Sequence, residues 1–268
     1  MSLMARAAVA VWQMAPTVGN RRANLARLAG AAGTARARGA TILVTPELSL
    51  TGYDIGALTD DDTDPELLTD LSRIAHNTGL ALVVGLALRQ DHQTWNCSAI
   101  VDRTGDLRGV YRKMHLFGDL DRSRFCSGTD GPLVVDVDGI TVGTLICYDI
   151  EFPEPARLAA LAGAQLLAIP TANMTPWHFI NEHVIPVRAF ENQFYVAYAN
   201  HHGTEGGTTY VGSSTIAAPE GATVRAGEDD EALILMTIDT DDLAQRRREA
   251  TYLIDRRPEL YDRLSQEN

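Results

Sequence analysis

The chain has 268 residues and a formal net charge of −12, with 45% hydrophobic and 22% charged residues. This composition is typical of a globular enzyme with a sizeable core. The strong negative charge argues against nucleic acids and anionic membranes as partners, because the protein would repel their phosphate groups.

The three cysteines are Cys97, Cys126 and Cys147, and they form neither a CxxC pair nor a zinc-finger spacing with histidine. An odd number in this arrangement favours neither a disulfide framework nor a structural zinc site. Residues 1–10 lack the features of a signal peptide, and no apolar stretch reaches the roughly 20 residues of a membrane helix. These features predict a cytoplasmic protein.

The first third of the sequence predicts strands that alternate with helices. The expected elements are strand 7–12, helix 20–38, strand 42–44, helix 65–77 and strand 80–88. The strands are short apolar runs, whereas the first helix has leucines at helical spacing and ends at Gly39. Pro65 suits the first turn of the second helix.

Shorter strands separated by turn signals dominate the rest of the chain. The expected strands are 98–102, 107–112, 133–137, 141–146, 166–169, 193–199, 210–217, 223–225 and 233–238. The expected helices are 153–163, 178–192 and 239–248. Roughly a dozen strands with about five or six helices predict two sheets with helices on their outer faces. No linker or repeat interrupts the pattern, so we expect residues 1–268 to form one domain.

Cys147 stands where an apolar strand ends, and a helix that begins with Pro153 follows it. A tight strand-to-helix turn of this kind is a nucleophile elbow, which exposes the sulfur. The nearby helix start favours a thiolate and a developing oxyanion. By itself, however, a cysteine in such a place is more often a buried core residue.

Glu47 and Lys113 follow two other expected strands. A carboxylate directly after a buried strand is costly unless it is paired, and it can act as a general base. An ammonium at a strand end can stabilise an oxyanion. Each of the two is more often an ordinary exposed residue, but together with Cys147 they supply what amide hydrolysis requires. A backbone N–H, that of Tyr148, would share the oxyanion with Lys113.

Three segments resemble the motifs of the nitrilase superfamily, also called carbon–nitrogen hydrolases, in the order found in that family. They are residues 46–53 (PELSLTGY), 111–117 (YRKMHLF) and 146–154 (ICYDIEFPE). The resemblance implies an α/β fold of the four-layer αββα sandwich type, and a homodimer or higher homo-oligomer formed through a helical face. It implies no metal and no organic cofactor. It also implies that Glu47, Lys113 and Cys147 are the base, the oxyanion stabiliser and the nucleophile.

One position departs from the family pattern. Many members carry a second glutamate a few residues after the lysine, where this chain has Asp121 in the segment 121–125 (DRSRF). The aspartate is one methylene shorter, and we expect it to hold Lys113 or to position the substrate. Asp119 competes for this role.

The elbow sequence resembles the amidase branches of the family, which predicts hydrolysis of a small carboxamide to a carboxylic acid and ammonia through a thioester. Nitrile or N-carbamoyl hydrolysis at the same site is the alternative, and a non-catalytic binding module is a third hypothesis. The residues expected to line the substrate pocket are Tyr53, Tyr148, Glu151, Asn173, Met174 and Trp177. His115 is expected to pack in its loop, and the adjacent pair His201-His202 lacks the i, i+4 spacing of helical metal ligands.

Overall fold

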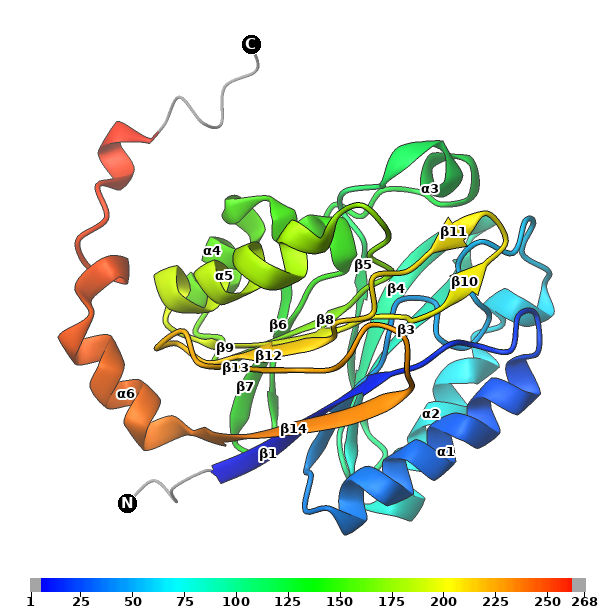
Figure 1. Ribbon diagram of the computed structural model, residues 1–268, viewed down its shortest axis with the longest axis horizontal. Helices are drawn as coiled ribbons and strands as arrows, with labels where there is room; N and C mark the ends of the chain where they lie inside the picture. Colours follow the sequence, from blue (N-terminus) through cyan, green and yellow to red (C-terminus); the bar gives the residue numbers. More distant parts are fainter. Residues whose placement is uncertain (1–5, 262–268) are drawn as a thin grey trace.

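The computed structural model describes residues 6–261, so the expected domain of residues 1–268 extends beyond the described part at both ends. Two six-stranded sheets pack face to face, and α-helices cover the outer face of each sheet (Figure 1). This arrangement is an αββα sandwich, which confirms the predicted four-layer fold.

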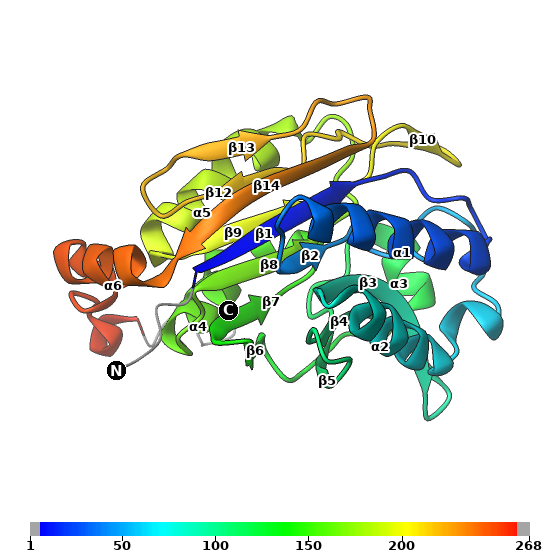
Figure 2. The ribbon, with the colours of Figure 1, turned by 90° about the horizontal axis from the view of Figure 1, so that it is seen from below.

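The first sheet has the strand order β14-β1-β2-β3-β4-β5. Its strands are β14 (Ala232–Asp239), β1 (Arg6–Gln13), β2 (Ile42–Val44), β3 (Ala81–Gln90), β4 (Gln93–Val101) and β5 (Leu107–Arg112). The central strands β1, β2 and β3 are parallel, and the outer pairings are antiparallel. Helices α1 (Arg21–Ala37) and α2 (Glu66–Thr78) cover its outer face (Figure 2).

The second sheet has the strand order β13-β12-β9-β8-β7-β6. Its strands are β13 (Thr223–Arg225), β12 (Thr215–Ala217), β9 (Tyr195–Ala199), β8 (Leu166–Pro170), β7 (Ile140–Thr144) and β6 (Leu133–Val137). Helices α4 (Pro153–Leu161) and α5 (Ile185–Asn192) cover this sheet on the side away from α1 and α2 (Figures 1 and 2).

Three further elements lie outside the sandwich layers. Helix α3 (Gly118–Arg124) and the hairpin of β10 (Thr204–Glu205) and β11 (Thr208–Thr209) both lie at the same end of the sheets (Figure 1). Helix α6 (Thr240–Glu249) follows β14 at the opposite end, and Asp239 caps it by accepting hydrogen bonds from two backbone N–H groups. An acidic N-cap of this kind matches the helix dipole.

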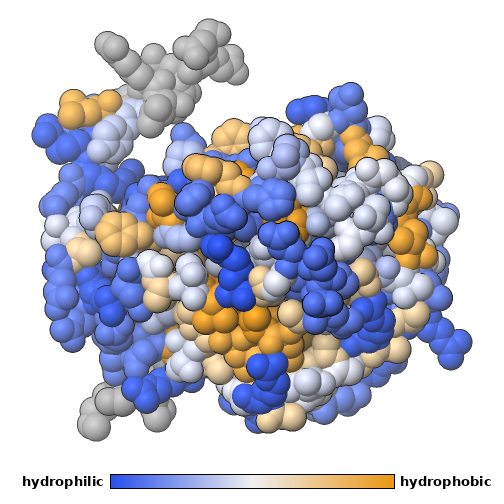
Figure 3. Space-filling model, in the orientation of Figure 1, coloured by the Kyte–Doolittle hydropathy of each residue, from blue (hydrophilic) through white to orange (hydrophobic). Residues whose placement is uncertain are grey.

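Alternation along the strands explains how the layers pack. In β1, Val9 and Val11 face the second sheet, whereas Ala10 and Trp12 pack against the cluster formed with α1 and α2. Because both faces of such a strand are buried, it is a nearly continuous apolar run in the sequence. The largest apolar patch on the face shown in Figure 3 lies where β14 passes β12 and β13, so it marks the edges at which the two sheets meet.

One expected strand is much shorter in the structure, and one expected helix has an irregular start. The expected strand 210–217 forms ladder pairs with the second sheet only in β12, because Gly212 and Ser213 have φ angles of 63° and 50°, which extended strands do not adopt. The expected helix 178–192 is helical over this range, but Ile180–Val184 form a π-helical turn before the α-helix continues at Ile185. Pro186 lacks the N–H that a continuous α-helix needs at this point.

Within the range 6–261, none of the helices combines the length and the apolar character needed to cross a membrane.

Candidate active site

Cys147 is the first residue of a short 3-10 turn, Cys147–Glu151, between the end of β7 and the start of α4 at Pro153. Its φ angle is 46°, in the left-handed region. A non-glycine residue there costs about 1–3 kcal/mol and is typical of strained functional turns. The predicted nucleophile elbow is therefore present, with a 3-10 turn between its strand and its helix.

Asp149 fixes the shape of this elbow. One carboxylate oxygen accepts hydrogen bonds from the backbone N–H of Ile146 (3.1 Å) and the hydroxyl of Tyr111 (2.7 Å). The other oxygen lies 2.9 Å from the backbone nitrogen of His115 and 2.8 Å from its ring Nδ1. The buried carboxylate thus ties the elbow to the segment that carries Lys113, and His115 has the structural role expected of it.

Glu47, Lys113 and Asp121 form a buried charge cluster. The Lys113 Nζ lies 2.7 Å from Glu47 Oε1 and 2.7 Å from Asp121 Oδ2, and all three side chains are fully buried. The side-chain amide of Asn96 donates a second hydrogen bond to Glu47 Oε1, also at 2.7 Å. The other oxygen, Glu47 Oε2, is buried and has no hydrogen-bond partner among the described residues. One oxygen of Glu47 is thus held in place, while the other has the capacity to accept a proton.

Asp121, and not Asp119, fills the second carboxylate position. Helix α3 brings its shorter side chain within direct reach of Lys113, and its Oδ2 also accepts a hydrogen bond from the backbone N–H of Phe117 at 3.0 Å. Asp119 is exposed and lies near Arg122 instead, at 3.8 Å. The missing methylene is compensated by the position of the backbone.

Two glycines allow the backbone around these residues to pack closely. A Cβ at Gly85 in β3 would lie 2.4 Å from the carbonyl oxygen of Pro46 and 2.7 Å from the Cα of Glu47. A Cβ at Gly128 would lie 2.3 Å from the carbonyl oxygen of Arg112, next to Lys113. Any larger residue at either position would displace the segment that carries Glu47 or Lys113.

Burial and mutual charge shift the pKa values of these groups. Burial raises the pKa of Glu47, and the charge of Lys113 opposes this shift without cancelling it. Burial by itself lowers the pKa of Lys113, but Glu47 and Asp121 together hold it well above its ordinary value. Burial and the charge of Glu47 raise the pKa of the Cys147 thiol well above its usual range. The thiol is therefore protonated at rest, and a thiol in this state can act as a nucleophile only if a nearby base removes its proton.

Two residues around Glu47 were not anticipated from the sequence. Asn96 lies in β4, two residues before the start of the expected strand, and a polar side chain within an apolar strand was the only signal. The His201 Nε2 lies 2.6 Å from the backbone oxygen of Glu47, and its Nδ1 lies 3.2 Å from that of Met14. Burial lowers the pKa of His201 to about 4, so the ring is neutral at pH 7.

A cavity of about 260 Å³ opens at Cys147. All six residues expected to contact the substrate line it, and the structure adds Phe117 and Ala172 to them. The complete lining is Tyr53, Phe117, Cys147, Tyr148, Glu151, Ala172, Asn173, Met174 and Trp177. Trp177 is half-exposed, whereas Tyr53 is buried. The cavity thus combines a cysteine thiol with mostly aromatic and apolar walls, as small-molecule sites do.

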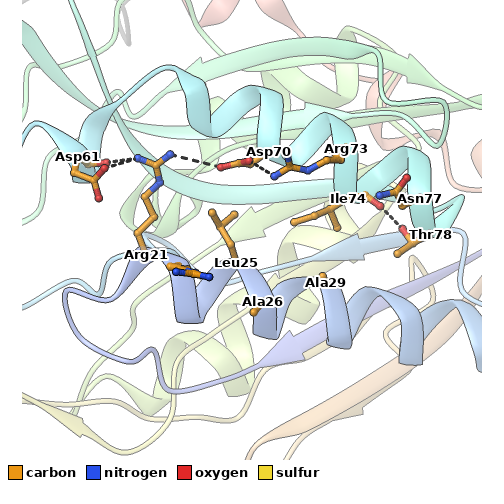
Figure 4. Close-up of a pocket in the computed structure, with 11 residues that line it drawn as sticks. Arg21, Leu25, Ala26, Ala29, Asp61, Asp70, Arg73, Ile74, Asn77 and Thr78 are labelled. Atoms are coloured by element: carbon orange, nitrogen blue, oxygen red, sulfur yellow. Dashed lines mark hydrogen bonds and ion pairs between the residues drawn. The ribbon is translucent and has the colours of Figure 1, made fainter.

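A second depression of about 550 Å³ lies between α1 and α2 (Figure 4). The Arg21 guanidinium lies between the carboxylates of Asp61 and Asp70, at 3.0 and 3.5 Å, and Arg73 also pairs with Asp70. This groove is lined by neither a cysteine nor a histidine, and its carboxylates are paired with arginines. The cavity at Cys147 is therefore the candidate active site. Within residues 6–261 no group of three or more His, Cys, Asp or Glu side chains is placed to hold a metal ion.

Comparison with known proteins gives concordant results. The carbon–nitrogen hydrolase family matches residues 8–248. A Pseudomonas protegens protein named "Hydrolase in pqqF 5'region" is 46% identical over 96% of this chain and 91% of its own length. The 2-oxoglutaramate amidase of Bacillus subtilis is 32% identical over 83% of this chain and 87% of its own.

A solved amidase structure agrees with the family match and with these two relatives. A mutant of the amidase from Nesterenkonia sp. AN1, in which acrylamide has undergone Michael addition at the active-site cysteine, superposes with a TM-score of 0.85. It is 32% identical and covers 96% of this chain and 99% of its own. The chain belongs to the carbon–nitrogen hydrolases of the nitrilase superfamily, in their amidase-like branch. It is an enzyme that cleaves carbon–nitrogen bonds other than peptide bonds.

Proposed function

We propose that this enzyme hydrolyses a small carboxamide to a carboxylic acid and ammonia, with Cys147 as the nucleophile. The single observation that carries the proposal is the arrangement of Glu47. One of its oxygens is fixed by Lys113 and Asn96, and the other is buried and unpartnered among residues 6–261, in the cluster whose charges act on the Cys147 thiol.

The reaction then proceeds in two halves. Glu47 takes the thiol proton as the Cys147 sulfur attacks the amide carbon, and the oxyanion is stabilised by Lys113 and the backbone N–H of Tyr148. Collapse breaks the carbon–nitrogen bond, and Glu47 returns the proton to the departing ammonia. A water molecule then attacks the thioester with Glu47 again as base, which releases the acid and restores the thiol.

Ammonia release from a panel of substrates tests this proposal. We expect turnover of small aliphatic amides, and weaker or no turnover of the matching nitriles and N-carbamoyl amines. Cys147→Ala should abolish release, because no other group in the cavity can form the thioester. Cys126→Ala is the matched control, since Cys126 is also partly exposed but lies outside the cavity. Release from nitriles alone, or residual activity in Cys147→Ala, would contradict the assignment.

We also propose that two copies associate through the outer faces of α4 and α5. Four large apolar side chains on these helices are exposed: Leu158, Leu161, Val187 and Phe190. An apolar surface of this kind on an ordered helical layer is typical of an interface between copies of one chain.

Sedimentation velocity at micromolar concentration is expected to show a dimer or a larger assembly. The double variant Leu158→Asp/Val187→Asp should shift it to the monomer, because each carboxylate would have to be buried without a partner. Val18→Asp, at an equally exposed apolar position before α1, should leave the assembly unchanged. A monomeric parent protein would rule out this interface.

The enzyme is proposed to act in the cytoplasm. All three cysteines are unpaired, which fits a reducing compartment.

A further inference from the structure

Glu151 places a carboxyl group in the wall of the cavity, four residues after the nucleophile. No lysine, arginine or histidine is among the described residues that line this cavity. Lys113, proposed above to stabilise the oxyanion at Cys147, is buried and already hydrogen-bonded to Glu47 and Asp121. Away from the reacting carbonyl, the charged group among the described lining residues is therefore the carboxylate of Glu151.

Arg188 is a second cation whose charge acts on Glu151, and it is engaged elsewhere. The Arg188 guanidinium donates to the backbone oxygens of Ile150 (3.0 Å) and Glu151 (2.8 Å), and it forms an ion pair with Glu191 at 2.9 Å. In the described part of the chain, the Glu151 carboxylate itself has neither an ion pair nor a side-chain hydrogen bond. A half-buried carboxylate without a partner can accept one from a ligand.

The other walls also suit a cation. Tyr53, Phe117, Tyr148 and Trp177 supply four of the nine lining residues. Aromatic faces attract ammonium groups, and the effect increases when the ammonium is removed from water. The net charge of −12 further favours approach of a cationic substrate over an anionic one.

We propose that the site selects amides that carry an ammonium group several bonds from the amide, with Glu151 as its acceptor, and that it rejects amides that carry a carboxylate. This inference rests on the proposed amidase function. Cys147 and Glu151 are the two ends of one 3-10 turn, which rises about 2 Å per residue. The ammonium therefore belongs near the far end of a short chain rather than on the carbon next to the amide.

The state of Glu151 gives this proposal a pH signature. Burial raises the pKa of Glu151 to about 7, against the opposing charges of Lys113 and Arg188. The cationic amide gains its contact only when this carboxyl is ionised, whereas a primary amine stays charged up to a pH of about 10. Preference for the cationic amide should therefore increase as the pH rises through about 7.

Three amides of similar size test the inference. They are 5-aminopentanamide (cationic), hexanamide (neutral, with a methyl group in place of the ammonium) and glutaramate (anionic). We expect kcat/KM for 5-aminopentanamide to exceed that for hexanamide by about tenfold or more, and glutaramate to be the poorest of the three. The readout is kcat/KM for 5-aminopentanamide divided by kcat/KM for hexanamide. A general loss of activity that affects both substrates equally cancels in this ratio.

Glu151→Gln should reduce this ratio to near one and abolish its increase with pH, and Glu151→Arg should make glutaramate the preferred substrate. Glu154→Gln, at an exposed carboxylate three residues later, should leave the ratio and its pH dependence unchanged. A ratio near one in the parent enzyme, or a ratio that survives Glu151→Gln, would overturn the inference. If none of the three amides releases ammonia, the proposed function itself fails, so the two failures are distinguishable.

Discussion

Glu47→Gln is expected to lower kcat for a neutral amide such as hexanamide by about 10²- to 10⁴-fold, the usual contribution of a positioned general base. Glutamine keeps the shape of the side chain, and its oxygen can still accept the hydrogen bonds from Lys113 and Asn96. It cannot take a proton from Cys147. Because burial raises the pKa of the Cys147 thiol, little thiolate would form without this base.

The pH profile provides an independent check of the same role. Burial raises the pKa of Glu47, so the carboxylate is protonated and inactive at pH values where an exposed glutamate would still be ionised. As the pH is lowered, activity toward hexanamide should therefore be lost at a pH above 4.5, which is the ordinary pKa of a glutamate.

Initial rates across a pH series for the parent enzyme and Glu47→Gln test both the expected fall in kcat and the expected loss of activity at acid pH. The residual activity of the variant should lack the acid limb assigned to Glu47. Glu154→Gln, at an exposed position, is the control for the substitution itself. A Glu47→Gln enzyme with near-normal kcat would show that another group removes the thiol proton.

Lys113→Met is expected to destabilise the fold by about 3–5 kcal/mol as well as abolish activity, because it removes the cation from a fully buried cluster. Glu47 and Asp121 would then be two buried carboxylates without a counterion. The loss of unfolding free energy should be largest at neutral pH. It should shrink as the pH falls, since protonation of the two carboxylates removes the cost of burying their charges.

Urea denaturation at several pH values measures this effect. The double variant Lys113→Met/Asp121→Asn should recover part of the free energy of unfolding but none of the activity, because the oxyanion stabiliser is still absent. Arg246→Met removes one partner of the exposed pair with Asp242, and it should cost only about 0–1 kcal/mol. Equal losses of unfolding free energy for Lys113→Met and Arg246→Met would contradict the stabilising role assigned to Lys113 in the buried charge cluster.

The local elements were predictable where the sequence pattern has one physical cause. The strand Ile42–Val44 and the strand Leu107–Arg112 begin and end as expected, because apolar runs between turn residues fix them. Helix α3 was not expected, since it is only seven residues long. The expected strand 210–217 was wrong over most of its length, because the positive φ angles of Gly212 and Ser213 depend on tertiary packing.

The candidate site shows the same division. Glu47, Lys113 and Cys147 each follow a strand, and strand ends are where functional residues gather in layered α/β folds. The contribution of Asn96 could not be predicted, because it depends on β4 passing next to the Glu47 segment. The adequacy of Asp121 also depended on geometry, because a side chain one methylene shorter reaches Lys113 only where α3 sets its backbone.

The sequence by itself determined the family, most of the order of strands and helices, and the elbow around Cys147, because these depend on local patterning and on residue types at fixed spacing. Only the tertiary structure decided which oxygen of Glu47 is unpartnered in residues 6–261, and that Glu151 lies in a cavity without a basic residue. Burial, pKa and charge balance arise where distant segments meet. A linear pattern cannot encode them, because they depend on distances that form only when the two sheets pack.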